Sequence, residues 1–518
     1  MTTVDDTPAP LTDDESEGQP PALTLARVRL GPGGPLGSVR IDGGRIVAVA
    51  ETDELGGPAL DMDGRTVLPG LWDAHVHAAQ WAGNRRRADL AGLESARAVA
   101  EAVRSYARGL PDGEVLVGQG FRDGLWPDAP DKALLDSVCP DRPVALISAD
   151  LHAAWLNSAG LALVGRPGHA TGLLREHDCF EVLRALPEVP VEVLDRWVAE
   201  ACREAAGRGV TGIVDFHFSD NLADWGRRAA RGPLGVRVRA AVYPGHLDAV
   251  IERGFRTGDV LPGTGGLVRV GPLKLFTDGS LNTRTALCCE PYPGLEGTPE
   301  AHGIEETAYT ELVRLMRRAA AHGIEPAVHA IGDRANTLAL DAFGAVGCRG
   351  RIEHAQLLRT ADMPRFAQLG VTASVQPAHA VDDRDVADRH WAGRTGRAFA
   401  YADLLAAGAR LEFGSDAPVA PLDPWLGIAA AVHRTDDGRP AWHPEQRVPM
   451  RTALAASARG RTAIRAGDPA DLVIVDADPG TADARTLRRM PVYGTLLGGH
   501  WTYGPDDGAR RTATFRPS

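Results

Sequence analysis

The sequence predicts an α/β protein: a (β/α)8 TIM-like barrel, a small β-sandwich domain built from both termini, and an insertion after the first barrel strand. Three observations predict this fold. The middle of the chain alternates β-like and α-like segments, both ends are rich in β-like runs, and one long early stretch does not fit the alternation. With 518 residues, the chain is also too long for one ordinary domain.

The two ends of the chain contain short strand-like runs. Residues 23–66 hold LTLARVRL, GSVRI and RIVAVA, and the DGG between the last two is a strong hairpin signal. Similar runs return at 470–476 and 492–497. We therefore expect 23–66 and 467–518 to form one composite β-sandwich domain. The first 22 residues are acidic and rich in Pro, Thr and Asp, which predicts a disordered N-terminal tail.

The barrel is expected over residues 67–466. Eight candidate strands follow one another there, and helical patterning lies between them, for example at 311–322 and 333–345. The candidate strands are 67–77, 209–217, 235–243, 267–276, 324–330, 350–355, 371–377 and 410–418.

Residues 84–200 are longer than a barrel helix requires, so we expect them to form an insertion. Helical patterning at 94–108 and 191–207 indicates that this insertion has helices of its own. Long insertions on this side of a barrel usually shape substrate pockets, so we expect this one to influence the choice of substrate.

Composition narrows the class of protein. A net charge of −12 and a pI near 5.8 argue against a nucleic-acid or anionic-membrane partner, which would favour a basic face. The six cysteines form no C-x-x-C pair, and the N-terminus lacks the pattern of a signal peptide. No apolar run approaches the roughly 18 residues needed to span a bilayer. These features predict a cytoplasmic enzyme for a small-molecule substrate and leave a homo-oligomer open.

Histidines recur at the ends of the candidate strands. His75 and His77 lie two residues apart, so on a strand both imidazoles point to the same face and can reach one cation at about 2 Å. A bare His-x-His pair also occurs on surfaces by chance, but the strand context favours metal ligands. His329 and His354 each end a later candidate strand, where barrel sites are built. Singly, each would be read as a core histidine; together with the first pair, we expect both to be ligands.

Two aspartates follow strand ends as well. Asp416, in GSDAP, would by itself be read as a turn residue before proline. With four histidines converging, we expect it to contact the metal and to act as the catalytic proton shuttle, because a carboxylate can accept a proton and hand it to a leaving group. Asp333 is expected to cap the helix that begins beside it.

Lys274 lies between apolar residues of the fourth candidate strand, where its ammonium group has little access to solvent. A buried lysine shifts its pKa readily. We therefore expect Lys274 to carry a carbamate, formed with carbon dioxide, whose two oxygens bridge two metal ions. The alternative is an unmodified lysine that pairs with an acid such as Asp278.

Several longer pieces of the chain carry a family resemblance. They include VLPGLWDAHVH, DLHAAWLNSAGL, TGLLRE, LKLFTDGSLNTRTA, VHAIGDRAN, RIEHAQ, VTASVQP, GSDAPV and PADLVIVD. In this order they cover about residues 23–500, and they resemble the amidohydrolase superfamily. Within it, they are most similar to amidohydrolase family 3, the YtcJ-like and N-substituted formamide deformylase branch.

The resemblance implies a site, residue by residue. It implies metal contacts at His75, His77, His329, His354 and Asp416, with Lys274 as the bridge. It also implies that four residues line the substrate pocket, although a buried side chain at these positions could equally be structural. These four residues are His152, Asn157, Glu176 and Arg284.

The implied activity is hydrolysis of a carbon–nitrogen bond other than a peptide bond, such as that of an N-substituted formamide or another amide, by a metal-activated hydroxide. Nitrogen and oxygen ligands suit zinc, and also manganese, iron, cobalt or nickel, so one or two divalent ions are expected. His217, at the end of the second strand, is a candidate for holding the oxyanion.

Three alternatives stay open. The same fold could hydrolyse an ester, a lactone or a phosphoester. A catalytically inactive barrel could serve as an interaction module, although such a protein should have lost ligands and this one keeps all six. A metal-dependent oxidoreductase is disfavoured because the sequence has no glycine motif for a redox cofactor.

Overall fold

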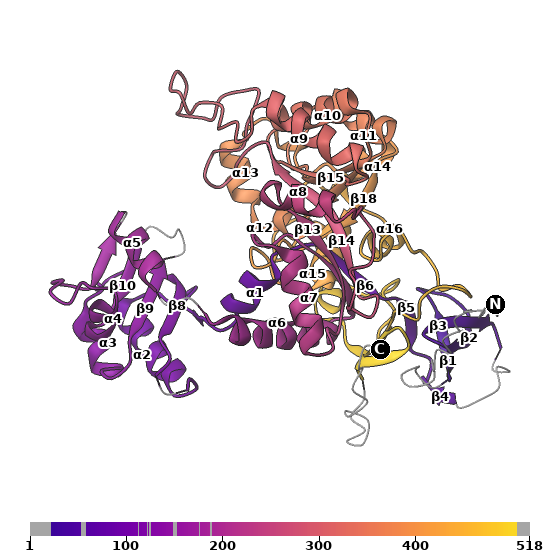
Figure 1. The fold of residues 1–518 in the computed structure, drawn as a ribbon, viewed down its shortest axis with the longest axis horizontal. Coiled ribbons are helices and arrows are strands. Elements are labelled where there is room, and N and C mark those ends of the chain that lie inside the picture. The colour runs from indigo at the N-terminus through magenta and orange to yellow at the C-terminus, as the bar shows by residue number, and fades with distance from the viewer. Residues whose placement is uncertain are drawn as a thin grey trace, which may run out of the picture. The chain divides into compact units, whose positions relative to one another are not determined.

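The structure is a computed structural model of the chain (Figure 1). It describes residues 22–52, 59–111, 113–121, 123, 126–148, 153–175, 177–186 and 189–504. The chain divides into two compact units: Met1–Ala78 together with Ala199–Ser518, and Ala79–Val198. Across the described ranges, none of the helices combines the length and the apolar character needed to cross a membrane.

Eight parallel strands form the central sheet of the first unit, in the order β6-β12-β13-β14-β15-β16-β17-β18. Each lies within one of the eight candidate strands, which confirms the predicted barrel. The strands are β6 (Leu71–Val76), β12 (Val210–Asp215), β13 (Arg237–Val242), β14 (Val268–Phe276), β15 (Pro326–Ala330), β16 (Gly350–His354), β17 (Val371–Val375) and β18 (Arg410–Phe413).

The sheet closes on itself where β18 meets β6. Val76 and Ala417 form a parallel bridge just beyond the end of β18. The Asp416 N–H donates to the His75 carbonyl at 2.8 Å, and the His77 N–H donates to the Ala417 carbonyl at 2.8 Å. These bonds bring the two predicted histidine ligands and the predicted proton shuttle together at the carboxyl ends of the strands.

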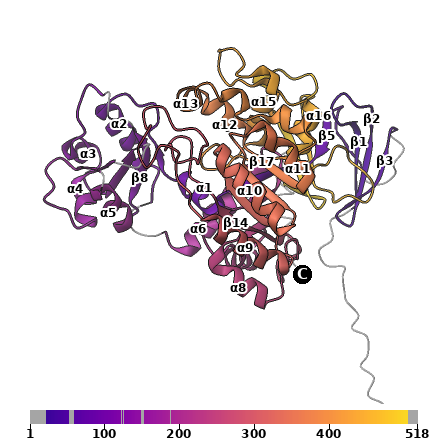
Figure 2. The ribbon, with the colours of Figure 1, turned by 90° about the horizontal axis from the view of Figure 1, so that it is seen from above.

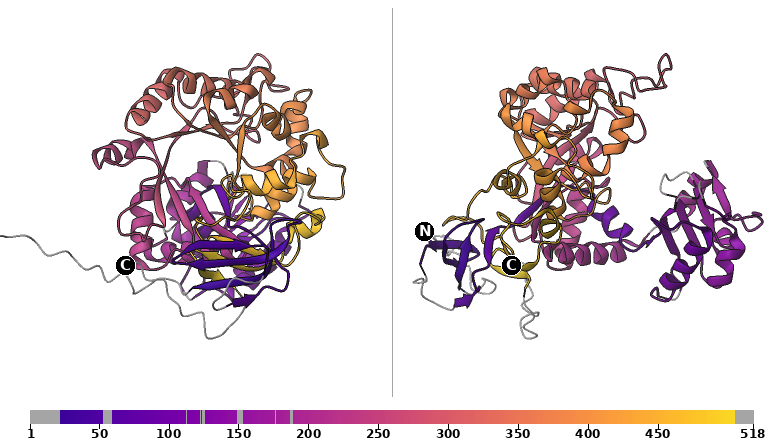
Figure 3. Two further views of the ribbon diagram at one scale, coloured as in Figure 1. Left: turned by 90° about the vertical axis from the view of Figure 1, so that its right-hand side faces the viewer. Right: turned by 180° about the vertical axis from the view of Figure 1, so that it is seen from behind.

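Helices lie around the outside of these strands (Figures 2 and 3). Their inner faces are apolar: α9, for example, buries Leu312, Met316 and Ala319, which share one face of the helix. The helices are α7 (Asn221–Arg231), α8 (Pro244–Glu252), α9 (Tyr309–Ala321), α10 (Asp333–Val346), α11 (Met363–Leu369), α12 (Pro377–Asp382), α13 (Arg384–His390), α14 (Tyr401–Ala406), α15 (Pro424–His433), α16 (Met450–Ala456) and α17 (Ala484–Arg488).

The predicted capping role of Asp333 is wrong. The residue at the N-cap of α10 is Gly332, and no side chain caps this helix. Asp333 is the first residue of the helix, and its buried carboxylate instead accepts hydrogen bonds from the Cys289 N–H at 2.8 Å and from Arg397 at 2.7 Å. The carboxylate therefore bonds to these two groups and not to the free N–H groups at the start of α10, and it links two loops to this helix.

Strands from both ends of the chain form one eight-stranded sheet in the same unit. In this sheet β5 pairs with β1 from the N-terminal region and with β19 from the C-terminal region. Apolar side chains from both ends, such as Leu25, Val39 and Leu472, pack in its core. The strands are β1 (Leu23–Leu30), β2 (Leu36–Asp42), β3 (Arg45–Ala50), β4 (Ala59–Asp61), β5 (Thr66–Pro69), β19 (Leu472–Val475), β20 (Val492–Leu497) and β21 (His500–Tyr503).

The first candidate strand is divided between two sheets at Gly70. The residues before it belong to β5 and those after it belong to β6. A Cβ atom at position 70 would lie 2.4 Å from the side chain of Thr211 on β12, so this crossing point has room only for glycine.

The second unit, Ala79–Val198, has a five-stranded sheet in the order β11-β10-β9-β8-β7 and a core of its own. Along β9 and β10, alternate residues enter two separate apolar clusters, one with Leu146 and Trp155 and the other with Ile147 and Ala154. Both faces of this sheet are therefore covered. The strands are β7 (Ala88–Asp89), β8 (Leu116–Phe121), β9 (Val144–Ser148), β10 (Ala153–Leu156) and β11 (Leu173–Arg175). The helices of residues 78–206 are α1 (Ala78–Asn84), α2 (Ala96–Ala107), α3 (Lys132–Val138), α4 (Ser158–Leu163), α5 (His177–Ala185) and α6 (Val191–Ala206).

Candidate metal centre

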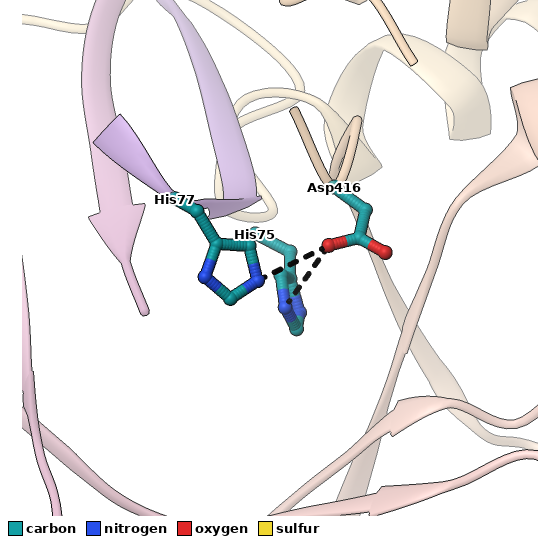
Figure 4. A group of neighbouring side chains, drawn as sticks. All are labelled: His75, His77 and Asp416. Atoms are coloured by element: carbon teal, nitrogen blue, oxygen red, sulfur yellow. Dashed lines mark ion pairs between the residues drawn. The ribbon is translucent and has the colours of Figure 1, made fainter. Parts of the chain in front are cut away.

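Three predicted ligands converge where the barrel closes. The Oδ1 atom of Asp416 lies 3.5 Å from Nε2 of His75 and 3.4 Å from Nε2 of His77 (Figure 4). Two ligand atoms at about 2.0–2.1 Å from one tetrahedral zinc ion are about 3.3–3.4 Å apart. The observed separations therefore match the edges of a tetrahedral zinc site.

Neighbouring groups set the orientation of His75. Its Nδ1 lies 2.7 Å from Oε2 of the buried Glu353, so the ring donates its proton there and turns Nε2 toward Asp416. Glu353 is itself ion-paired with Arg351. Burial, aided by the positive charge of Lys274, lowers the pKa of His75 to about 4.

The carboxyl group of Asp416 is ionised under the same conditions. Burial raises its pKa, but the neighbouring imidazoles of His75 and His77 outweigh that effect and hold the pKa below its ordinary value. Because Nδ1 of His75 donates to Glu353, its Nε2 presents a lone pair to the carboxylate oxygen of Asp416. Two acceptors in this position repel each other, and a cation between them would remove the repulsion, so the residues present fit a divalent ion.

His354 is also close to these residues, and its ring centroid lies 4.9 Å from that of His75. Its Nδ1 is 2.9 Å from Oε1 of Gln376, which leaves Nε2 available to the site. Nitrogen atoms of His354 and His379 and an oxygen of Asp416 all lie within 4.8 Å of one another, and all three residues are buried. His379, from α12, was missed by the sequence analysis.

His329 is adjacent, but it is in neither group of potential ligand atoms. Its ring centroid lies 4.5 Å from that of His354, and its Nε2 lies 3.0 Å from the Gly279 carbonyl oxygen. That bond leaves Nδ1 as the nitrogen available for a metal ion. Burial and the charge of Lys274 lower the pKa of His329 to about 3.

Lys274 is buried between aromatic rings. Its Nζ lies 4.7 Å from the ring centroid of Phe216 and 4.9 Å from that of Phe276, and burial lowers its pKa to about 8. The alternative pairing with Asp278 is wrong, because the Asp278 carboxylate instead accepts backbone N–H bonds from Leu287, Ile331 and Gly332. The structure therefore leaves the Lys274 amine next to the metal-site residues.

The structure describes two of the four predicted pocket residues, Asn157 and Arg284. His152 and Glu176 lie outside the described residues. Asn157 is fully buried in the second unit, where its side chain caps α4 and bonds to the backbone of Cys139, Arg142, Val144 and Gly160.

These four bonds use all the donor and acceptor capacity of the Asn157 amide, so the geometry supports a structural role for this residue. Arg284 is exposed on the loop that follows β14. His217 follows β12, and its Nδ1 is buried without a hydrogen-bond partner among the described residues.

Two further residues beside the ligands were missed, and each had a weak signal. Glu353 directly precedes His354, and strict alternation along a strand would point the two side chains to opposite faces. The alternation fails because His354 has a φ of 75° and leaves strand geometry. Phe218 is a large apolar residue three positions beyond the end of β12. Its side chain is 60% exposed, and its ring stacks on His77 with the ring centroids 5.3 Å apart.

Comparisons with known proteins identify the family of this chain. The model of the amidohydrolase family matches residues 59–503. A putative amidohydrolase, YtcJ, from Bacillus subtilis (strain 168) is 30% identical over 88% of this chain and 91% of its own length. An N-substituted formamide deformylase from Arthrobacter pascens is 27% identical over 90% of this chain and 94% of its own.

A solved structure has a similar fold. The crystal structure of an uncharacterized metal-dependent hydrolase from Pyrococcus horikoshii OT3 has a TM-score of 0.75 and 27% identity, covering 90% of this chain and 99% of that one. A family match over most of the chain and a relative with 30% identity leave no ambiguity about membership. The chain belongs to the amidohydrolase family and is a hydrolase of the amidohydrolase superfamily.

Proposed function

We propose that this protein is a metal-dependent hydrolase that cleaves a carbon–nitrogen bond other than a peptide bond, such as that of an N-substituted formamide or another amide. The observation that carries the proposal is the carboxylate of Asp416, held 3.4–3.5 Å from two imidazole nitrogens at the closed end of the barrel. The likeness to N-substituted formamide deformylase over 94% of that enzyme supports the choice of bond.

Each metal-site residue has a defined task in this proposal. His75, His77, His329, His354 and Asp416 would hold one or two divalent ions, and Lys274, as a carbamate, would supply further oxygen ligands. Zinc is the proposed metal because the donors are imidazole nitrogens and carboxylate-type oxygens. A bound divalent ion supplies Lewis-acid chemistry: it lowers the pKa of water and polarises a carbonyl group.

Asp416 moves the proton. Its carboxylate takes the proton that the attacking water loses and delivers it to the departing amine, which would otherwise be a poor leaving group. The backbone holds this carboxylate in place, because the Asp416 N–H is bonded to the His75 carbonyl at 2.8 Å. Glu353 and Gln376 orient His75 and His354 through their Nδ1 atoms, which fixes the tautomers of both rings.

An aromatic wall next to His77 supports a substrate with an apolar substituent. The ring of Phe218 stacks on His77 and Phe276, with centroids 5.3 Å and 5.9 Å away, and contacts Tyr243 at 5.3 Å. An exposed aromatic ring beside a reactive site buries apolar ligand surface when substrate binds. We therefore place the nitrogen substituent of the amide against this wall.

The test is a substrate panel with protein loaded with zinc, cobalt or manganese. N-alkyl and N-aryl formamides and N-acetyl amines are compared with esters, lactones, phosphoesters and Xaa-Pro dipeptides at equal concentration. Release of formate or amine should be fastest for the formamides, and the Asp416→Asn variant should lose that activity. A higher kcat/KM for any ester, lactone, phosphoester or dipeptide would refute the proposed bond. No turnover of the whole panel by protein with full metal content would favour an inactive interaction module.

A further inference from the structure

His379 is a histidine that the family resemblance does not assign to the metal site. It lies on α12, the short helix after β17, and its side chain is only 5% exposed. Its Nε2 is buried and has no hydrogen-bond partner among the described residues. A buried imidazole nitrogen without a partner is costly, so its position calls for a ligand.

The surroundings of His379 identify the kind of ligand. Nitrogens of His379 and His354 and an oxygen of Asp416 lie within 4.8 Å of one another. His75, His77 and the same Asp416 form a separate group that satisfies the same condition. Two imidazoles and a carboxylate are a common donor set for zinc, and here the set occurs twice around one shared residue.

The segment that contains His379 also orients the ring of His354. Gln376 follows β17 and accepts the Nδ1–H of His354 at 2.9 Å, which turns the other nitrogen of that ring toward the site. Three residues after Gln376, the side chain of His379 lies beside His354 and Asp416. One short segment, QPAH, thus supplies both an orienting group for one histidine and a second imidazole beside it.

We propose that His379 is a metal ligand: with His354 and Asp416 it holds a second divalent ion, next to the ion held by His75, His77 and Asp416. This inference rests on the proposed metal-dependent function and adds to it a ligand from α12. His329, whose ring lies 4.5 Å from that of His354, is beside this second position.

The experiment is zinc titration of metal-free full-length protein, followed by calorimetry and by elemental analysis. Wild type should bind two ions, and His379→Asn should bind one with unchanged affinity and the other at least about 100-fold more weakly. Loss of even an outer-shell partner of a ligand typically weakens metal binding about 10–100-fold, so loss of a ligand should exceed that range. His433→Asn is the matched control, because Nε2 of His433 is also buried without a partner but belongs to neither group of donor atoms. That variant should bind two ions as wild type does.

Other outcomes separate this inference from the proposed function. If His379→Asn binds two ions as tightly as wild type, His379 is not a ligand. If wild type binds a single ion that His379→Asn retains and His75→Asn loses, the second position is refuted while the metal-dependent function stands. If wild type binds no ion, both are refuted. Should His379→Asn fail to fold, a crystal structure of zinc-loaded wild type decides: a nitrogen of His379 within about 0.2 Å of the usual 2.0–2.1 Å from an ion supports the inference, and one beyond about 3 Å refutes it.

Discussion

Replacing Asp416 by asparagine tests the proposed proton transfer directly. Asp416 has a φ of 59°, a conformation that asparagine adopts about as readily as aspartate, so the backbone should not be strained by the change. The backbone bonds between Asp416, Ala417 and the His75–His77 segment do not involve the altered atoms and should persist. The substitution removes one charge and the ability to accept a proton, and it keeps the size and shape of the side chain.

The expected loss follows from that single change. General acid–base catalysis is typically worth about 10²–10⁴-fold, which corresponds to about 2.7–5.4 kcal/mol of transition-state stabilisation. We expect kcat for the best formamide substrate to fall by at least about 10²-fold. Metal content is measured on the same samples, because the amide oxygen of asparagine is also a weaker ligand.

A matched variant controls for the loss of a buried carboxylate. Asp423 is half-buried, caps α15 and pairs with Arg208 at 2.8 Å, and it belongs to neither group of potential metal ligands. Asp423→Asn should lower stability and leave kcat near the wild-type value. An Asp416→Asn protein that keeps its metal and more than about a tenth of its kcat would show that another group moves the proton.

Four further predictions follow from particular contacts. Protein purified without chelators should contain one or two equivalents of transition metal; elemental analysis that finds fewer than about 0.2 equivalents, with activity insensitive to chelators, would contradict the metal site. Glu353→Gln should weaken metal binding by about 10–100-fold in calorimetric titrations, because the charge that orients His75 is lost; an unchanged affinity would show that the bond between them is dispensable. Lys274 should give a carbamate signal in ¹³C NMR after incubation with ¹³C-bicarbonate and zinc, and that signal should disappear in Lys274→Arg; an unmodified ammonium group in the metal-loaded wild type would rule out the bridge. Gly212→Ala should lower the free energy of unfolding, measured in urea, by about 1–3 kcal/mol, because the new Cβ would lie 2.2 Å from the Trp72 ring. In the double variant, Trp72→Leu should recover most of that loss. If the effects of the two substitutions on the free energy of unfolding are simply additive, this clash is not the cause.

The barrel could be read from the sequence because each strand combines a short apolar run with turn residues at its ends. Parallel barrel strands are buried on both sides, so the runs are nearly continuous and easy to find. These apolar runs do not show which of the sheets a strand joins. The segment 67–77 reads as one strand, yet β5 and β6 pair with different sheets on either side of Gly70. That division depends on the close approach of Thr211, which is about 140 positions away in the sequence.

Only the site residues that lie at or near the ends of barrel strands could be predicted from the sequence. His75, His77, His354 and Asp416 lie at or just beyond the ends of barrel strands, and the structure brings them together. His379 could not be found in this way, because it lies on a helix and reaches the site only through the turn after β17. The Asp333 prediction failed for a related reason: a helix start offers one cap position, but tertiary partners such as Arg397 decide which side chain fills it.

The shared position of Asp416 explains why this site needs a carboxylate there. Both His75 and His354 have one ring nitrogen committed to an orienting partner, Glu353 or Gln376, so each has one nitrogen left for a metal ion. A carboxylate suits a residue that belongs to two groups of donor atoms, because it has two oxygens where an imidazole with one committed nitrogen would have one donor atom. In the proposed reaction it also takes up a proton and releases it, which an amide could not do. Finally, it must accept a positive φ, and aspartate is among the few residues other than glycine that do so readily. Aspartate therefore meets the backbone, ligand and proton requirements of position 416 together.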